Sequence, residues 1–263
     1  MPKWTTLGVG VAAVLALAAC KPDSAPAPAT SASAPSAGPP ASPSAQPSVQ
    51  VPADPGKALL AAAGRLGAQP FKLKFSALGQ EATGSIDLSA RTSEIDTLLQ
   101  NGATISVRQL GTDQYVQVTG DSADALHATP GKWMHADTKG LPATNPLSPD
   151  HNQAASAAKL LKDASAVRRT ADGTYSGKAD LSHGAAQLPS SLTGKLKAVP
   201  FTARLDPQGR LTSLIFDMNS VLSGAGELNT AYYDYGVPVS VARPAATETV
   251  PMPDAFKKAI GLG

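Results

Sequence analysis

The chain has 263 residues, with 22 Lys and Arg against 20 Asp and Glu and a formal net charge of +2 at pH 7. This balance, without any run of basic residues, argues against nucleic acid as a partner. The single Cys and the four scattered His residues show no spacing typical of metal ligands, so the sequence predicts no metal and no other cofactor in the folded part of the chain.

The first 19 residues have the pattern of a signal peptide. Lys3 precedes an apolar stretch over residues 7–16, which is too short to remain as a membrane span. The tetrapeptide Leu17-Ala18-Ala19-Cys20 follows, and its order of Leu, two small residues and Cys resembles the lipobox of bacterial lipoproteins. That resemblance implies that the chain is cut just before Cys20 and that the Cys20 thiol carries a lipid anchor with fatty acids such as palmitate.

An ordinary signal peptide with a chance Cys, or an uncleaved anchor, would account for the same residues. The cysteine count favours lipidation, because a lone thiol in an exported chain has no disulfide partner. We therefore expect Cys20 to attach the protein to the membrane. The protein would then lie at the extracytoplasmic face of the cell membrane.

A change of composition divides the rest of the chain. Residues 21–53 consist almost wholly of Ala, Pro and Ser, and such a segment cannot bury enough apolar surface to offset the entropy lost on ordering. We expect residues 20–53 to comprise the lipidated Cys and a disordered tether. Residues 54–263 are enough for one large core and are predicted to form a single domain.

The domain opens with a predicted helix, which Asp54 can cap and whose first turn suits Pro55. A period of two then replaces the helical period, because apolar and polar residues alternate as in half-buried strands. Turn residues such as Asn101-Gly102 separate the alternating segments. The predicted strands cover residues 71–77, 84–89, 94–100, 104–108, 115–118, 131–135, 166–169, 175–179, 199–205, 211–218, 228–235 and 237–241.

Further helical signals interrupt and end the run of strands. A second helix is predicted to begin at Ser148-Pro149-Asp150, where a cap, a proline and an acid precede an apolar stripe. Residues 183–197 carry Leu at every fourth position together with Pro189 and Gly194, which favours either a short lid or a surface loop held by its leucines. A tail helix with Phe256 and Ile260 on one face is expected to close the domain.

About a dozen short antiparallel strands and two substantial helices predict an α+β fold in which a large curved antiparallel sheet forms a half-barrel. Alternating strands leave one face of such a sheet apolar, so we expect the two helices to cover that face. The space between sheet and helices is where a ligand would lie.

The domain lacks the sequence motifs of common hydrolases, metalloproteases and phosphate-binding loops, and we expect no enzyme activity. Arg168-Arg169 stand before a hairpin, where they would meet an acidic head group or form a solvated strand edge. Trp133 and the tyrosines near position 233 would line a ligand pocket or belong to the core.

The order of these features is similar to that of the actinobacterial LppX/LprG-type lipoproteins, which share a LolA/LolB-like half-barrel. The shared features are the lipobox, the Ala/Pro/Ser tether, the opening helix, Gly131-Lys132-Trp133-Met134, the helix led by Ser148-Pro149 and the closing Tyr-Asp-Tyr-Gly-Val-Pro-Val-Ser-Val of residues 233–241. The resemblance covers residues 54 to about 250. It implies a protein that carries lipids or acylated glycolipids in a hydrophobic cavity between sheet and helices, and it brings no catalytic residues.

Two functions fit these features. The first is a monomeric lipoprotein that binds a lipid or acylated glycolipid and transports it within the cell envelope. Its cavity would be lined by apolar strand residues, for which the candidates are Phe71, Phe75, Trp133, Phe201 and Phe216. The second is a non-enzymatic scaffold or sensor lipoprotein whose interior is filled by its own side chains. The volume of the interior distinguishes the two.

Overall fold

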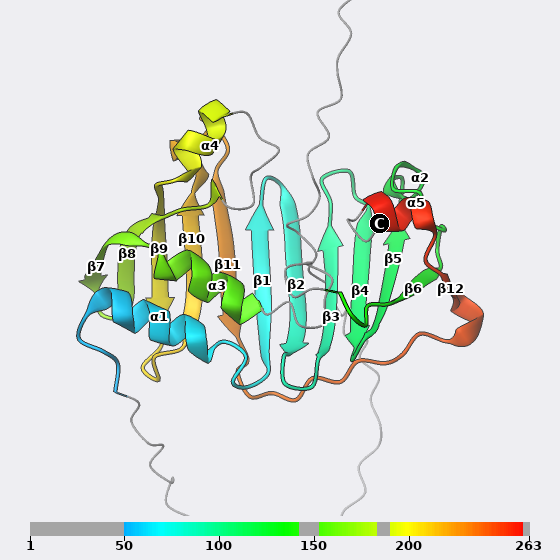
Figure 1. Ribbon diagram of the computed structural model, residues 1–263, viewed down its shortest axis with the longest axis horizontal. Helices are drawn as coiled ribbons and strands as arrows, with labels where there is room; N and C mark the ends of the chain where they lie inside the picture. The colour runs from blue at the N-terminus through cyan, green and yellow to red at the C-terminus, as the bar shows by residue number, and fades with distance from the viewer. Residues whose placement is uncertain (1–49, 142–152, 183–189, 260–263) are drawn as a thin grey trace, which may run out of the picture.

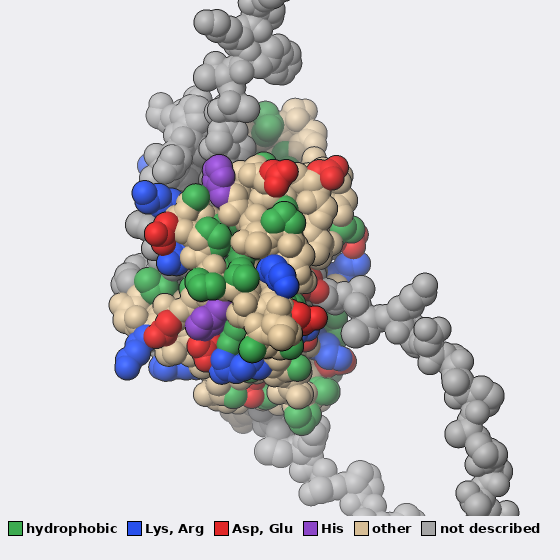
Figure 2. Space-filling view, turned by 90° about the vertical axis from the view of Figure 1, so that its right-hand side faces the viewer, with side chains coloured by type: hydrophobic (Ala, Val, Ile, Leu, Met, Phe, Trp, Pro, Cys, Tyr) green, Lys and Arg blue, Asp and Glu red, His purple; other side chains and the backbone are tan. Residues whose placement is uncertain are grey.

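The structure is a computed structural model that describes residues 50–141, 153–182 and 190–259. These residues form a 12-stranded sheet with the strand order β12-β6-β5-β4-β3-β2-β1-β11-β10-β9-β8-β7. β12 runs parallel to β6, and the other neighbouring pairs are antiparallel. The sheet is curved and does not close, since β7 and β12 stand at its two ends (Figure 1). The end with β12 faces the viewer in Figure 2. The predicted α+β half-barrel is therefore confirmed.

The sheet combines two meanders and one short returning strand. The first meander contains β1 (Phe71–Ala77), β2 (Gln80–Asp87), β3 (Thr92–Leu98), β4 (Thr104–Leu110), β5 (Asp113–Thr119) and β6 (Trp133–Asp137). The second contains β7 (Ser165–Ala171), β8 (Thr174–Ala179), β9 (Val199–Leu205), β10 (Leu211–Asp217) and β11 (Glu227–Tyr233), and β12 (Thr249–Pro251) returns beside β6. Because β11 pairs with β1, the two meanders form one continuous sheet.

Short helices accompany the strands. The described helices are α1 (Pro55–Arg65), α2 (Ser122–Ala125), α3 (Gln153–Lys162), α4 (Ser190–Leu196), α5 (Asp254–Ala259) and the 3₁₀ helices η2 (Met218–Ser220) and η3 (Ala246–Glu248). α1 packs against α3, β7 and β10, and both long helices lie over one face of the second meander (Figure 1). We call this the inner face of the sheet and the opposite one the outer face.

α1 forms where the sequence predicts a helix. The Asp54 carboxylate accepts a hydrogen bond from the backbone N–H of Lys57 at 2.8 Å, and Pro55 occupies the first turn. The buried side of the helix carries Leu59 and three alanines, which are Ala58, Ala62 and Ala63. These small side chains let the backbone of α1 pack closely against α3, β7 and β10 on the inner face.

Alternation along each strand separates the two faces. Phe71 pairs in register with Ile86, and Leu214 pairs with Ala203; all four residues are buried on the inner face. Lys72, the next residue after Phe71, belongs to the outer face. The core therefore lies between the inner face and the helices, as the period of two predicts.

The predicted strand over residues 237–241 is wrong. The chain turns at Gly236 after β11, and residues 237–245 form no strand. β11 already pairs with β1 on one side and with β10 on the other, so it has no free edge for a further hairpin partner. The apolar alternation of this segment instead belongs to a connection that runs from β11 to β12.

Some expected features fall partly or wholly outside the described residues. The predicted helix start at Ser148-Pro149-Asp150 lies outside them, and the described helix α3 begins at Gln153. Of the segment 183–197, residues 190–196 form α4, in which Leu196 is buried. The tail helix is present as α5 with Phe256 buried, whereas Ile260 is outside the described residues.

The connection over residues 234–248 is held on the outer face of the first meander by cationic side chains. Arg108 donates a hydrogen bond to the backbone oxygen of Ala242 at 3.3 Å. Arg243 donates to the carboxylate of Asp113 on β5 at 2.7 Å and also to the hydroxyl of Tyr115. His135 Nε2 lies 2.7 Å from the other oxygen of Asp113. Asp113 is therefore the central group of this attachment.

The hydrogen bonds from Arg243 and then His135 lower the pKa of Asp113 below its ordinary value of 3.8. A lowered folded-state pKa gives stabilisation that is present at pH 7 and is lost as the pH falls through that pKa. We expect Asp113→Asn to lower the midpoint of urea denaturation at pH 7, and the difference from wild type to shrink below about pH 4. A difference that stayed constant from pH 7 to pH 3 would contradict this role of Asp113.

Candidate functional site

Four of the predicted lining residues lie together on the inner face. Phe71, Phe201 and Phe216 are 1%, 3% and 7% exposed, and Phe75 is half-buried on the same face. Phe216 pairs in register with Phe201, and β11 lies between β10 and β1, which carries Phe71 and Phe75. The alternation of the sequence thus places these four side chains on one face of the sheet, and their role in lining a ligand cavity stays a prediction.

The three buried rings belong to the hydrophobic core between the inner face and the helices. The ring of Phe71 lies 6.0 Å from those of Tyr232 and Tyr235, and the rings of Phe201 and Phe216 are 6.1 Å apart. Burial raises the pKa of Tyr232 to about 12, and it also raises the pKa of Tyr235, whose hydroxyl donates to the Leu211 carbonyl at 2.5 Å. These aromatic side chains pack on one another.

Trp133 lies on the outer face, apart from the four phenylalanines. Its neighbour Met134 is fully buried on the inner face, where it pairs in register with Val116. The Arg108 guanidinium stacks over the Trp133 ring at 4.5 Å from its centre and binds the Glu94 carboxylate at 2.7 Å. Trp and Met are both apolar, so only the register with β5 decides which of the two points inward.

Among the described residues, the inner-face side chains are less buried at the end of the sheet where β1 ends and β11 begins. Phe75 has small register partners on both sides, Ala82 on β2 and Thr230 on β11. Leu228 on β11 and Met218 just after β10 are also only partly buried and pack against the core. An apolar strip thus approaches the upper edge of the sheet in Figure 1.

Three exposed leucines stand at the same edge. Leu78, Leu222 and Leu98 are 61%, 58% and 49% exposed. They belong to the β1–β2 turn, the loop between η2 and β11, and the end of β3, which all lie along the upper edge in Figure 1. We call these three residues the apolar rim. Gln100, in the β3–β4 turn, donates a hydrogen bond to the Leu78 carbonyl, so two of the turns touch.

Leu78 is an unusual residue for its position. It occupies the first place of the two-residue turn Leu78-Gly79, with φ at +49°. This left-handed conformation favours Asn, Asp or Gly, and a Leu there is both strained and exposed to water. The rim was not predicted, although a Leu before Gly in a tight hairpin was a signal visible in the sequence.

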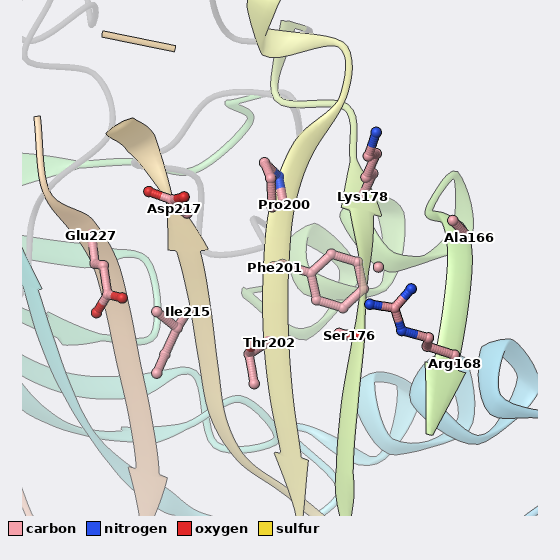
Figure 3. Close-up of a pocket in the computed structure, with 11 residues that line it drawn as sticks. Ala166, Arg168, Ser176, Lys178, Pro200, Phe201, Thr202, Ile215, Asp217 and Glu227 are labelled. Carbon is pink, nitrogen blue, oxygen red and sulfur yellow. The ribbon is translucent and has the colours of Figure 1, made fainter. Parts of the chain in front are cut away.

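A second feature is a groove on the outer face of the second meander, with a volume of about 360 Å³. Strands β7 to β11 form it, and Figure 3 shows its residues. Cationic Arg168 and Lys178 lie toward β7, whereas Asp217 and Glu227 lie toward β11. Its floor includes Pro200, Thr202 and Ile215. The sequence did not reveal this groove, because its charged residues come from four strands whose order depends on the fold.

The remaining predictions concern the lipid anchor, membrane-spanning helices and metal sites. Cys20 lies outside the described residues, so its lipidation stays a prediction. Within the described ranges, no helix is long and apolar enough to cross a membrane. The same ranges contain no group of three His, Cys, Asp or Glu side chains placed to hold a metal ion.

An open, curved antiparallel sheet with helices on its inner face defines the class of α+β half-barrels. Among solved structures, the chain is similar to the lipoprotein LppX of Mycobacterium tuberculosis, with a TM-score of 0.41 and 16% sequence identity over 70% of this chain and 98% of that chain. The comparison thus finds a lipoprotein of the type that the sequence resembles. Comparison of the sequence with protein-family models and with curated proteins gives no match.

Proposed function

We propose that this protein is a membrane-anchored bacterial lipoprotein that binds the acyl chain of a lipid or acylated glycolipid against the inner face of its sheet and carries it within the cell envelope. The observation that carries the proposal is the apolar rim, in which Leu78 and Leu222 stand at the same edge of the sheet as the half-buried strip of Phe75, Leu228 and Met218. Leu98, the third rim residue, pairs with Glu81 and faces the outer side of that edge. Exposed apolar side chains next to an apolar interior suit the entry of a lipid chain.

The energetics favour such a ligand. Each buried CH₂ group contributes about 0.8 kcal/mol, so a chain of ~16 carbons is held strongly even when the surrounding packing is imperfect. The lipobox at Cys20 supports the same proposal, because an anchor would keep the rim close to a lipid source.

The scaffold function has one observation in its favour. Phe71, Phe201 and Phe216 are buried and in ring contact with their neighbours, as expected of an interior filled by its own side chains. The two functions differ in what the strip near Phe75 does. In a carrier, this strip accepts a lipid chain; in a scaffold, it binds none.

Lipid binding is tested by filling the strip. Leu228→Trp adds bulk on the inner face of β11, and Ala231→Trp adds similar bulk on the outer face of the same strand. Protein purified from its own host is extracted with organic solvent for mass spectrometry, and the delipidated chain is titrated with a fluorescent fatty acid. We expect co-purifying lipid in wild type, uptake reduced at least tenfold by Leu228→Trp, and uptake unchanged by Ala231→Trp.

Absence of bound lipid from the host-purified protein, together with no uptake by the delipidated chain, would favour the scaffold function instead.

The rim is tested with Leu78→Asn. Asn tolerates the positive φ of this turn, so the free energy of unfolding should stay unchanged or rise by about 1 kcal/mol. Transfer of the fluorescent fatty acid from vesicles should nevertheless slow severalfold, because an exposed apolar contact with the bilayer is lost. Leu60→Gln, on the exposed side of α1, serves as the control. Equal transfer rates for Leu78→Asn and wild type would remove the rim from the mechanism.

The anchor is tested with Cys20→Ala. The thiol is the only one in the chain, so its loss should move the protein from the membrane fraction to the soluble fraction of host cells. Cys20→Ala protein that stayed with the membrane after a carbonate wash would show that another segment holds it there.

A further inference from the structure

The groove on the outer face lies on the opposite side of the sheet from the proposed acyl-chain site, and its chemistry is different. It is lined by cations at one end, by carboxylates at the other and by uncharged side chains between them (Figure 3).

The cationic end depends on a β-bulge in β7. Ser165 pairs with Lys178 and Arg168 pairs with Ser176, so β7 has one more residue than β8 over this stretch. Ala166, inside the bulge, has φ at +52°. A bulge re-aims the side chains that follow it. Arg168 faces the groove, and Figure 3 shows its guanidinium pointing toward the middle of the groove.

The consecutive residues Arg168 and Arg169 therefore have separate roles. Arg169 points to the inner face, where it donates a hydrogen bond to the buried Tyr175 hydroxyl at 2.8 Å. Arg168 and Lys178 make neither an ion pair nor a hydrogen bond within the described parts of the chain. Two uncompensated cations thus stand at one end of one groove.

Ser176 adds an unsatisfied polar atom between these cations. It is the register partner of Arg168, and it lies two residues before Lys178 on the same face of β8. Its Oγ is buried and has no hydrogen-bond partner among the described residues. A buried hydroxyl without a partner costs about 1–3 kcal/mol. Because Ser176 lines the groove, its Oγ can donate to an oxyanion held by Arg168 and Lys178.

The opposite end of the groove brings two carboxylates close together. Asp217 and Glu227 are direct register partners on β10 and β11, and both line the groove. Like charges directly opposite each other in an antiparallel pair destabilise it. Asp217 accepts hydrogen bonds from Asn219, whereas Glu227 has no ion pair or hydrogen bond within the described ranges. An ammonium group between the two carboxylates would remove their repulsion.

The distance between the cationic end and the carboxylate end of the groove limits the length of the ligand. Lys178 and Asp217 stand on strands separated by β9, so their backbones are about 10 Å apart. Their side chains shorten this distance from both sides. We propose that the groove binds a zwitterion of the phosphoethanolamine type, with its phosphate at Arg168, Ser176 and Lys178 and its ammonium at Asp217 and Glu227. The head group of a phospholipid and a free phosphate ester of ethanolamine share this chemistry.

The test uses the full-length chain and calorimetric titration with phosphoethanolamine, with inorganic phosphate alone and with ethanolamine alone. Phosphoethanolamine should bind at least tenfold more tightly than either part. The double variant Arg168→Gln/Lys178→Gln and the single variant Glu227→Gln remove one end each, and both should weaken its binding at least fivefold. Arg204→Gln is the matched control, because Arg204 is an exposed cation on the same face of β9 that does not line the groove.

A second arm separates the two sources of the ligand. Sedimentation with phosphatidylcholine vesicles is compared with and without phosphatidylethanolamine, whose primary ammonium can donate to carboxylates. Recruitment that requires phosphatidylethanolamine and is lost in the Glu227→Gln variant supports a lipid head group. Binding of free phosphoethanolamine without such recruitment supports a soluble ester.

Three results would overturn the proposal. One is no saturable binding of phosphoethanolamine in either arm. Another is binding of inorganic phosphate that is equally tight and indifferent to Glu227→Gln, which would mean an anion site only. The last is an equal loss in the Arg204→Gln control, which would mean a general charge effect. Fatty-acid uptake at the inner face is measured separately, so failure here leaves the acyl-chain proposal standing, and the reverse also holds.

Discussion

The pairing of β1 with β11 is the contact on which the rest of the structure depends, because it joins the two meanders into one sheet. It places Leu73 opposite Tyr232 on the inner face. Lys72 and Asp234 form an ion pair of 2.8 Å at one end of this seam, but both side chains are well exposed, so the pair contributes little. The contact of Phe71 with Tyr232 and Tyr235 holds the seam more firmly, since it buries apolar surface.

This seam also explains how the candidate sites are distributed. The half-buried strip near Phe75 and the apolar rim draw on residues from both meanders, so they exist only when β1 and β11 are paired. The groove with Arg168 and Glu227 belongs to the second meander alone. Its register is set by local hairpins and by the bulge in β7. An acyl chain and a charged head group would thus meet opposite faces of one sheet, in which β10 and β11 contribute to both sites.

Local signals in the sequence were sufficient for the elements and for much of the core. Asp54 and Pro55 predicted α1, and alternation around Phe71 and Phe201 placed these rings on the inner face. The failures concern contacts between distant segments. Whether Trp133 or Met134 points inward depends on pairing with β5, and residues 237–241 are no strand because β11 has two neighbours already. The groove needs the order of four strands, which no short pattern encodes.

The bulges of β7 have a consequence for the ends of the sheet. β7 is the last strand on one side of the described sheet, and such an edge offers unpaired N–H and C=O groups to any other extended chain. Two shifts of register interrupt this edge, and Arg168 and Arg169 place charge on it. At the other end, β12 has only three residues and finishes at Pro251, which lacks an N–H donor. A 12-stranded sheet is thereby discouraged at both ends from growing by strand addition into fibres.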